Sequence, residues 1–209
     1  MVDKISSWKF VEEFIEEPVA TLKARARADE FGIECITPAT GAQLAFIASA
    51  LGAKAIVEAG TGAGVSGLWL LSASEASVLA TIDSEPEFQA AAKQAFQEAE
   101  IASNRTRVIS GKAIEVMSNM ADAAYDLVFL DADRDSLEAQ LHEAVRLLRP
   151  GGVVVIAHAL WRDRVPDPAM RDDATVTYRD ALRFFTQNES FVTAISAIGD
   201  GLLMASKRH

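Results

Sequence analysis

The sequence predicts an α/β protein with a largely parallel sheet, helices on both faces of that sheet, and an antiparallel hairpin at its end. Three observations support this class. Short β-rich runs alternate with helical patterns, the central runs are almost entirely apolar, and the last two runs are joined by an Asp-Gly turn. A strand that is buried on both faces carries apolar residues at nearly every position, which is typical of parallel sheets covered by helices.

The expected elements follow one another regularly after the first 50 residues. The first five strands are expected at 55–59, 78–82, 106–109, 126–130 and 152–157. Helical patterns lie between them around 64–73, 86–101, 111–119 and 135–148. The first 50 residues predict two or three helices, with Pro38 at the start of the helix over 39–51, so a helical cover precedes the sheet.

The last 20 residues depart from this alternation. Two apolar runs at 191–197 and 202–206 are joined by Ile198-Gly-Asp-Gly, a short turn that connects antiparallel strands. A dinucleotide-binding sheet ends instead with a crossover helix and a parallel strand. No repeat, low-complexity block or linker interrupts the chain, so we expect one domain over residues 1–209.

Composition limits the partners and the environment of the protein. The formal charge of −10 disfavours binding to nucleic-acid phosphates. The sequence has no apolar run long enough to cross a bilayer and no secretory signal, and its single cysteine, Cys35, cannot form an internal disulfide. We therefore expect a cytoplasmic protein that binds neither nucleic acid nor membranes.

A glycine-rich loop, Gly60-Thr-Gly62-Ala-Gly64, follows the first expected strand and leads into a helix. Asp83 ends the next strand about 20 residues on, where a carboxylate can accept hydrogen bonds from both hydroxyls of a ribose. The dinucleotide fingerprint requires Gly-x-Gly-x-x-Gly, and Glu58, just before the loop, would repel a pyrophosphate but suit an ammonium group. These features favour S-adenosylmethionine, which carries a ribose and an amino acid but no phosphate.

Further motifs resemble those of one enzyme family. The chain is similar over nearly its whole length to the catechol and caffeoyl-CoA type O-methyltransferases, most closely to their small bacterial members. The motifs are Ile36-Thr-Pro-Ala-Thr-Gly-Ala-Gln-Leu, Val57-Glu-Ala-Gly-Thr-Gly-Ala-Gly-Val-Ser, Thr81-Ile-Asp-Ser-Glu-Pro-Glu, Asp126-Leu-Val-Phe-Leu-Asp-Ala-Asp, Leu147-Leu-Arg-Pro-Gly-Gly and Leu160-Trp161.

The resemblance implies a Rossmann-like methyltransferase sheet of seven strands with the last two reversed, a homodimer, and a small-molecule acceptor with a phenolic hydroxyl. It also implies a cofactor site, with Glu58 and Ser66 by the amino-acid end, Asp83 on the ribose and Ala113 against the adenine. The residues that the resemblance places in this site are Ile36, Glu58, Gly60, Thr61, Ser66, Asp83, Ala113 and Asp131.

The catalytic positions depart from the family pattern. In the metal-dependent relatives, an Asp after strand four and an Asp-Asn pair after strand five hold a divalent cation, and a Lys near the first Asp acts as the base. Asp131 matches that first Asp, but the pair is Ala157-His158 and the Lys position holds Arg134. An alanine offers no oxygen to a hard cation, so we predict no metal site, and arginine stays protonated, so it cannot be the base.

The resulting hypothesis is a metal-independent methyl transfer with Asp131, His158 and Arg134 as catalytic residues. His158 would deprotonate or orient the acceptor hydroxyl near Asp131, and Arg134 or Arg162 would bind an acidic group of the acceptor. A hydrogen-bonded strand-end residue without catalytic duty is an open alternative for His158. Two other functions also stay open: a protein that binds S-adenosylmethionine or S-adenosylhomocysteine with a degenerate catalytic site, and a nicotinamide-dependent oxidoreductase, which the glycine spacing and the hairpin disfavour.

Overall fold

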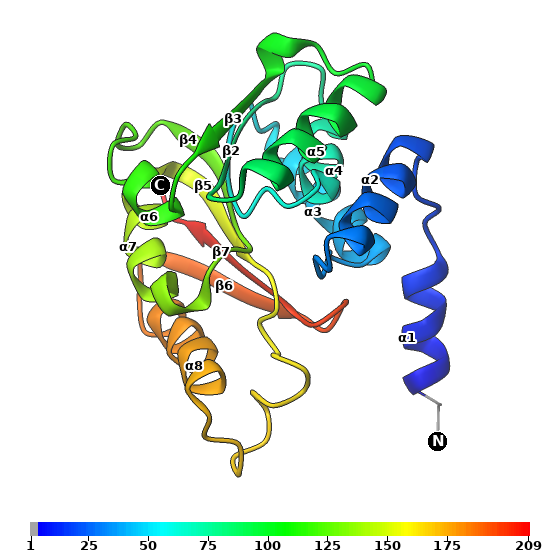
Figure 1. Ribbon diagram of the computed structural model, residues 1–209. Helices are drawn as coiled ribbons and strands as arrows, with labels where there is room; N and C mark the ends of the chain where they lie inside the picture. The colour runs from blue at the N-terminus through cyan, green and yellow to red at the C-terminus, as the bar shows by residue number, and fades with distance from the viewer. Residues whose placement is uncertain (1–3) are drawn as a thin grey trace.

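The computed structural model describes residues 4–209, which form a seven-stranded sheet with helices on both faces (Figure 1). The strands are β1 (Ala55–Ala59), β2 (Val78–Asp83), β3 (Thr106–Ser110), β4 (Tyr125–Leu130), β5 (Leu148–Ile156), β6 (Phe191–Ser196) and β7 (Leu202–Lys207). The α-helices are α1 (Lys4–Glu13), α2 (Val19–Glu30), α3 (Pro38–Leu51), α4 (Val65–Ser72), α5 (Pro86–Glu98), α6 (Ala113–Met117), α7 (Leu137–Leu147) and α8 (Asp173–Thr186). The expected α/β class, the seven strands and the N-terminal helical cover are confirmed.

The strand order is β3-β2-β1-β4-β5-β7-β6, and the first five of these strands are parallel. The chain builds outward from β1 in one direction through β2 and β3, and then in the other direction through β4 and β5. The order therefore reverses between β1 and β4. In open α/β sheets, ligands bind outside the carboxyl ends of the strands at such a reversal point.

The terminal hairpin is confirmed, but the expectation that both of its strands are reversed is wrong. Strand β7 is antiparallel to β5 and to β6, so β6 runs in the same direction as β1–β5 and β7 alone is reversed. The reason is the connection through α8. It crosses over from β5 and starts β6 parallel to β5, but it leaves a gap of one strand between them. The hairpin then inserts β7 between β5 and β6.

Alternation of side chains along the strands divides the core into two layers. One face of the sheet packs against α3, α4 and α5, with Leu44, Trp69 and Phe96 from the helices. The other face packs against α7 and α8, with Leu141 and Phe185. Figure 1 shows these two groups of helices on opposite sides of the strands. The near-continuous apolar runs of the central strands follow from this burial on both faces.

Several boundaries differ from those expected. Helix α6 is shorter than the pattern over 111–119, β5 begins four residues earlier than 152, and no element was expected where α8 lies. Helix α8 begins after Asp172, whose carboxylate accepts the backbone N–H of Thr175 at 3.1 Å, an N-cap bond. Across residues 4–209, no helix combines the length and the apolar content that crossing a bilayer requires.

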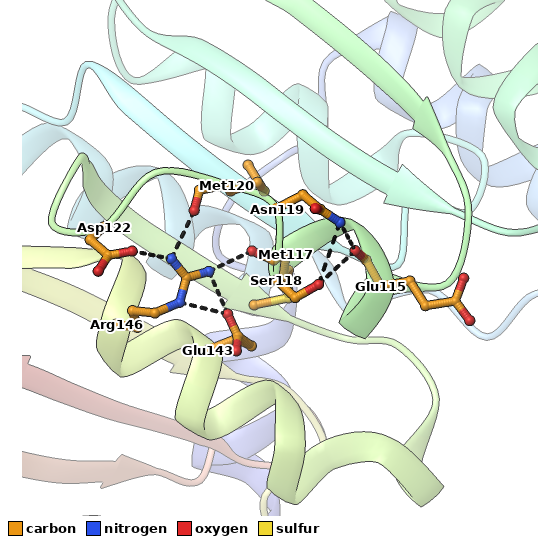
Figure 2. A network of polar contacts seen from close by, with 8 residues as sticks. All are labelled: Glu115, Met117, Ser118, Asn119, Met120, Asp122, Glu143 and Arg146. Carbon is orange, nitrogen blue, oxygen red and sulfur yellow. Dashed lines mark hydrogen bonds and ion pairs between the residues drawn. The ribbon is translucent and has the colours of Figure 1, made fainter.

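A polar network around Arg146 fixes the position of α6 (Figure 2). The Arg146 guanidinium, on α7, donates to the carbonyl oxygens of Met117 at 2.7 Å and Met120 at 2.8 Å, and pairs with Glu143 and Asp122. Met117 ends α6 and Met120 follows it, and carbonyl groups at the end of a helix lack partners within the helix. Arg146 therefore joins α7 to the segment that carries Ala113.

Candidate active site

The glycine loop between β1 and α4 brings two strand ends into close contact. Gly60 has φ +94°, in the left-handed region, and a Cβ at this position would lie 2.1 Å from the carbonyl oxygen of Asp131. A side chain at position 60 would therefore force β1 and β4 apart. Glycine is required here because of both the dihedral angle and the close backbone approach.

A pocket of about 630 Å³ opens at this loop, at the carboxyl ends of β1, β2 and β4. Its walls are the glycine loop, the segment between α2 and α3, the start of α6, and the residues after β4. Of the expected cofactor residues, those that line this pocket are Ile36, Gly60, Thr61, Ser66, Asp83, Ala113 and Asp131. The structure therefore gathers seven of these eight residues around one cavity, although they come from five separate segments of the chain.

Glu58, the eighth, does not line the pocket. Its side chain is fully buried, and it accepts a hydrogen bond of 2.6 Å from the Thr81 hydroxyl. The Thr81 hydroxyl lies 2.7 Å from that of Thr61, which does line the pocket. Burial raises the pKa of Glu58 to about 7, although the hydroxyls of Ser66 and Thr81 act in the opposite direction. Hydrogen bonds therefore connect Glu58 to the pocket lining through Thr81 and Thr61.

Asp83 lies at the end of β2 and is held by the glycine loop. Its Oδ2 accepts the backbone N–H of Gly62 at 2.9 Å, and its Oδ1 accepts that of Glu85 at 3.0 Å. Each carboxylate oxygen has further lone pairs, so these bonds fix the carboxylate while leaving acceptor capacity toward the pocket. This is the arrangement needed to bind two adjacent hydroxyl groups.

The pocket lining is strongly acidic. Lys112 is its single basic residue, whereas its carboxylates come from Glu34, Asp83, Glu115, Asp131, Asp133 and Asp135. A diphosphate would be repelled by so many carboxylates, and a cationic ligand would be attracted. The electrostatics of the pocket therefore suit a sulfonium nucleoside better than a dinucleotide.

His158 follows β5 and bridges two carboxylates. Its Nε2 lies 3.3 Å from Asp131 Oδ1, and its Nδ1 lies 3.0 Å from Asp200 Oδ2. Burial acts to lower the pKa of His158, but the contacts with Asp131 and Asp200 and their charges outweigh it and raise the pKa to about 9. At neutral pH the ring is therefore an imidazolium, which favours an orienting role over that of a free base. The residue also has φ +57°, a conformation that is uncommon outside glycine.

A second, smaller cavity of about 60 Å³ lies beside the first. His158 and Asp200 line it together with Thr37 and Thr40 from the start of α3. The segment Glu34–Ile36 lines both cavities and so separates them.

Trp161 forms an aromatic and cationic cluster next to His158. Its ring stacks on Tyr178 from α8, with centroids 5.2 Å apart, and meets His158 edge-on. The guanidinium carbons of Arg134 and Arg162 lie 4.6 and 5.5 Å from the same ring centroid. Arg134 thus lies beside the centre, near Trp161, but it lines neither cavity.

The residues present do not fit a hard divalent cation. Ala157 has no ligand atom, and both ring nitrogens of His158 face carboxylates. Within residues 4–209, no three His, Cys, Asp or Glu side chains are arranged to hold a metal ion. The His158 imidazolium instead places positive charge beside Asp131.

Two residues of this centre were missed in the sequence. Asp200 was interpreted solely as part of the Asp-Gly turn, yet its carboxylate contacts His158 and accepts the backbone N–H of Arg162 at 2.5 Å. Glu34, in the segment between α2 and α3, pairs with Arg162, in the segment after β5, at 2.8 Å. A carboxylate in the turn of a hairpin that neighbours β5 was the available signal for Asp200, whereas nothing in the local sequence marked Glu34.

The reversed strand order, the glycine loop and the acidic pocket define a nucleoside-binding enzyme with a Rossmann-like methyltransferase sheet. The O-methyltransferase family model matches residues 12–208, so the chain belongs to the O-methyltransferase family. It is 48% identical to a probable O-methyltransferase of Mycobacterium tuberculosis over 96% of this chain and 90% of that protein. The family predicted from the motifs is confirmed.

Solved structures share the fold. A protein from Corynebacterium glutamicum is 31% identical and superposes with a TM-score of 0.90, covering 99% of this chain and 98% of the other. The O-methyltransferase TomG of Streptomyces achromogenes, solved in complex with SAM, is 24% identical, has a TM-score of 0.83 and covers 100% of both chains. The latter similarity establishes the fold alone.

Proposed function

We propose that this enzyme transfers a methyl group from S-adenosylmethionine to a phenolic hydroxyl of a small molecule. The observation that carries the proposal is the acidic pocket of about 630 Å³, in which Asp83 is held beside a glycine loop without room for a Cβ at position 60. Such a pocket can accept a ribose and a cationic amino acid. In this arrangement Asp83 binds the ribose hydroxyls, Ala113 contacts the adenine, and Ser66 and Thr61 lie toward the amino-acid end.

The bound nucleoside supplies an activated methyl group, so the protein has to align the acceptor and manage one proton. S-adenosylmethionine, held by Asp83, Ser66 and Thr61, would give its methyl group to the acceptor oxygen and leave as S-adenosylhomocysteine, with the electron pair of the broken carbon–sulfur bond on sulfur. The hydroxyl proton passes to Asp131 and then to water. His158, as an imidazolium, stabilises the negative charge that develops on the acceptor oxygen, and Arg134 adds positive charge nearby.

Direct titration of the purified enzyme tests the nucleoside part of the proposal. We expect S-adenosylmethionine and S-adenosylhomocysteine to bind in calorimetry, and NAD not to bind. Asp83→Asn is the variant that should weaken both nucleosides, and Asp29→Asn, an exposed carboxylate on α2, is its control. If the wild-type enzyme binds neither nucleoside, the proposal fails.

A second candidate is a protein that binds the nucleoside with a degenerate catalytic site. The observation in its favour is the loss of the oxygen ligand at Ala157 and of the lysine at Arg134. Assays of methyl transfer to catechol, hydroxycinnamates and other phenols, with and without Mg²⁺, separate the two candidates. Nucleoside binding without any methyl transfer across this panel would favour the degenerate site.

Three further parts of the proposal concern the whole molecule. We propose one domain, because all seven strands of the described chain form one sheet, and a cytoplasmic location, because Cys35 is a lone thiol. We also propose a homodimer, because the apolar side chains of Phe10 on α1, Phe14 just after α1 and Phe46 on α3 are 65%, 67% and 72% exposed. A second copy of the chain would cover this surface. Sedimentation equilibrium of the wild type and of Phe46→Glu tests the dimer, which the charged variant should weaken.

A further inference from the structure

The side chains around Trp161 carry information on the chemistry of the acceptor. Arg134 and Arg162 approach the same indole from different segments, the residues after β4 and those after β5. The cluster adjoins His158, whose ring lies edge-on to Trp161 with centroids 6.4 Å apart. Two guanidinium groups are therefore concentrated at the rim of a site whose other charged side chains are mostly acidic.

The two arginines differ in their partners. Arg162 pairs with Glu34 at 2.8 Å, and both side chains are more than 60% exposed. Arg134 has no carboxylate partner in the described part of the chain, and its recorded contact is the Trp161 ring. An exposed ion pair contributes little to stability, so the bond between Glu34 and Arg162 can be exchanged for one to another anion.

Glu34 lies where the ion pair with Arg162 is next to both cavities. It lines both the large pocket and the small cavity, which lie on either side of the segment between α2 and α3. Its ion pair with Arg162 connects that segment to the loop after β5. A negatively charged acceptor bound beside His158 can replace Glu34 on Arg162.

We infer that Arg134 and Arg162 form an anion subsite beside Trp161, so that the enzyme selects phenolic acceptors that carry a carboxylate. The inference rests on the proposed methyl transfer and names its substrate class. Guanidinium groups bind carboxylates through paired N–H donors, and an indole beneath them keeps them in place. The hydroxyl that receives the methyl group lies at Asp131 and His158, and the carboxylate of the acceptor lies at the arginines.

Two phenols that differ by one carboxylate test this assignment: 3,4-dihydroxybenzoate and catechol. Each is titrated by calorimetry at low salt into the enzyme saturated with S-adenosylhomocysteine. We expect the benzoate to bind roughly three- to tenfold more tightly than catechol, the range for a partly exposed, charge-assisted pair. Arg134→Gln and Arg162→Gln should each reduce this preference, and Glu34→Gln should increase it.

Arg107→Gln provides the matched control. It removes the same charge from an exposed position on β3, an edge strand separated from β4 and β5 by β2 and β1. Its preference should equal that of the wild type. Equal binding of the two phenols, failure of both to bind, or the same loss of preference in Arg107→Gln would each overturn the subsite. Methyl transfer to catechol and binding of S-adenosylhomocysteine report on the proposed function separately, and retained nucleoside affinity shows that each variant is folded.

Discussion

His158 should make the free energy of unfolding of the enzyme depend on pH, and His158→Gln should remove this dependence. The ring bridges Asp131 and Asp200, and these carboxylates raise its pKa from 6.5 to about 9 against the opposing effect of burial. A group whose pKa is higher in the folded than in the unfolded state stabilises the fold when protonated. The stabilisation is fully present below pH 6.5 and is lost as the pH rises through 9.

The size of the effect follows from the shift. One pKa unit corresponds to about 1.4 kcal/mol, so a rise from 6.5 to about 9 corresponds to roughly 3 kcal/mol. The His158 side chain is 17% exposed, so solvent screening removes a modest part of this. We expect His158→Gln to lose about 2 to 3 kcal/mol more stability at pH 6 than at pH 9.5.

Urea unfolding of the wild type and of His158→Gln at pH 6, 7.5 and 9.5, followed by fluorescence, measures this difference. Taking the difference between the two proteins cancels groups they share, such as Glu58, whose raised pKa also makes stability fall with rising pH. His142→Gln is the control, because that ring packs against Phe184. A free-energy difference that is the same at all three pH values would refute the imidazolium bridge.

Three further substitutions have defined outcomes. Gly60→Ala places a Cβ 2.1 Å from the Asp131 carbonyl oxygen at φ +94°, so we expect a lower melting temperature and at least tenfold weaker binding of S-adenosylhomocysteine in calorimetry. Asp83→Asn removes the charged acceptor for the ribose and should weaken the same nucleoside roughly 10- to 100-fold. Arg105→Met removes donors to three backbone carbonyls, of which those of Leu71 and Ser77 are buried, and should cost about 3 kcal/mol in urea unfolding, with nucleoside affinity unchanged.

The parts of the site that could be predicted are those with a local signature. The glycine loop and Asp83 each follow a strand whose apolar run is visible in the sequence, and parallel strands bring their carboxyl ends to one edge. The pocket accordingly forms where these segments meet. The turn at Asp200-Gly201 predicted the hairpin for the same local reason, because two short runs joined by such a turn have to pair.

The parts that could not be predicted depend on contacts between distant segments. Whether Glu58 faces the pocket or the core is decided by packing on both sides of β1, and here it is fully buried against Thr81. The contact between Glu34 and Arg162 joins residues 128 positions apart, which no local pattern encodes. The direction of β6 depends on the position in the sheet to which the connection through α8 leads.

The terminal hairpin connects the fold to the chemistry of this enzyme. Because β7 inserts between β5 and β6, the turn before it lies next to the end of β5, where His158 is located. Asp200, in that turn, contacts Nδ1 of His158 and accepts the backbone N–H of Arg162. Non-glycine residues in this stretch adopt positive φ, with +57° at His158, +44° at Trp161 and +53° at Arg162, and the surroundings have to stabilise such backbone. One carboxylate thus holds both the imidazolium and the loop that carries Trp161, so the turn before β7 also orders the residues around His158.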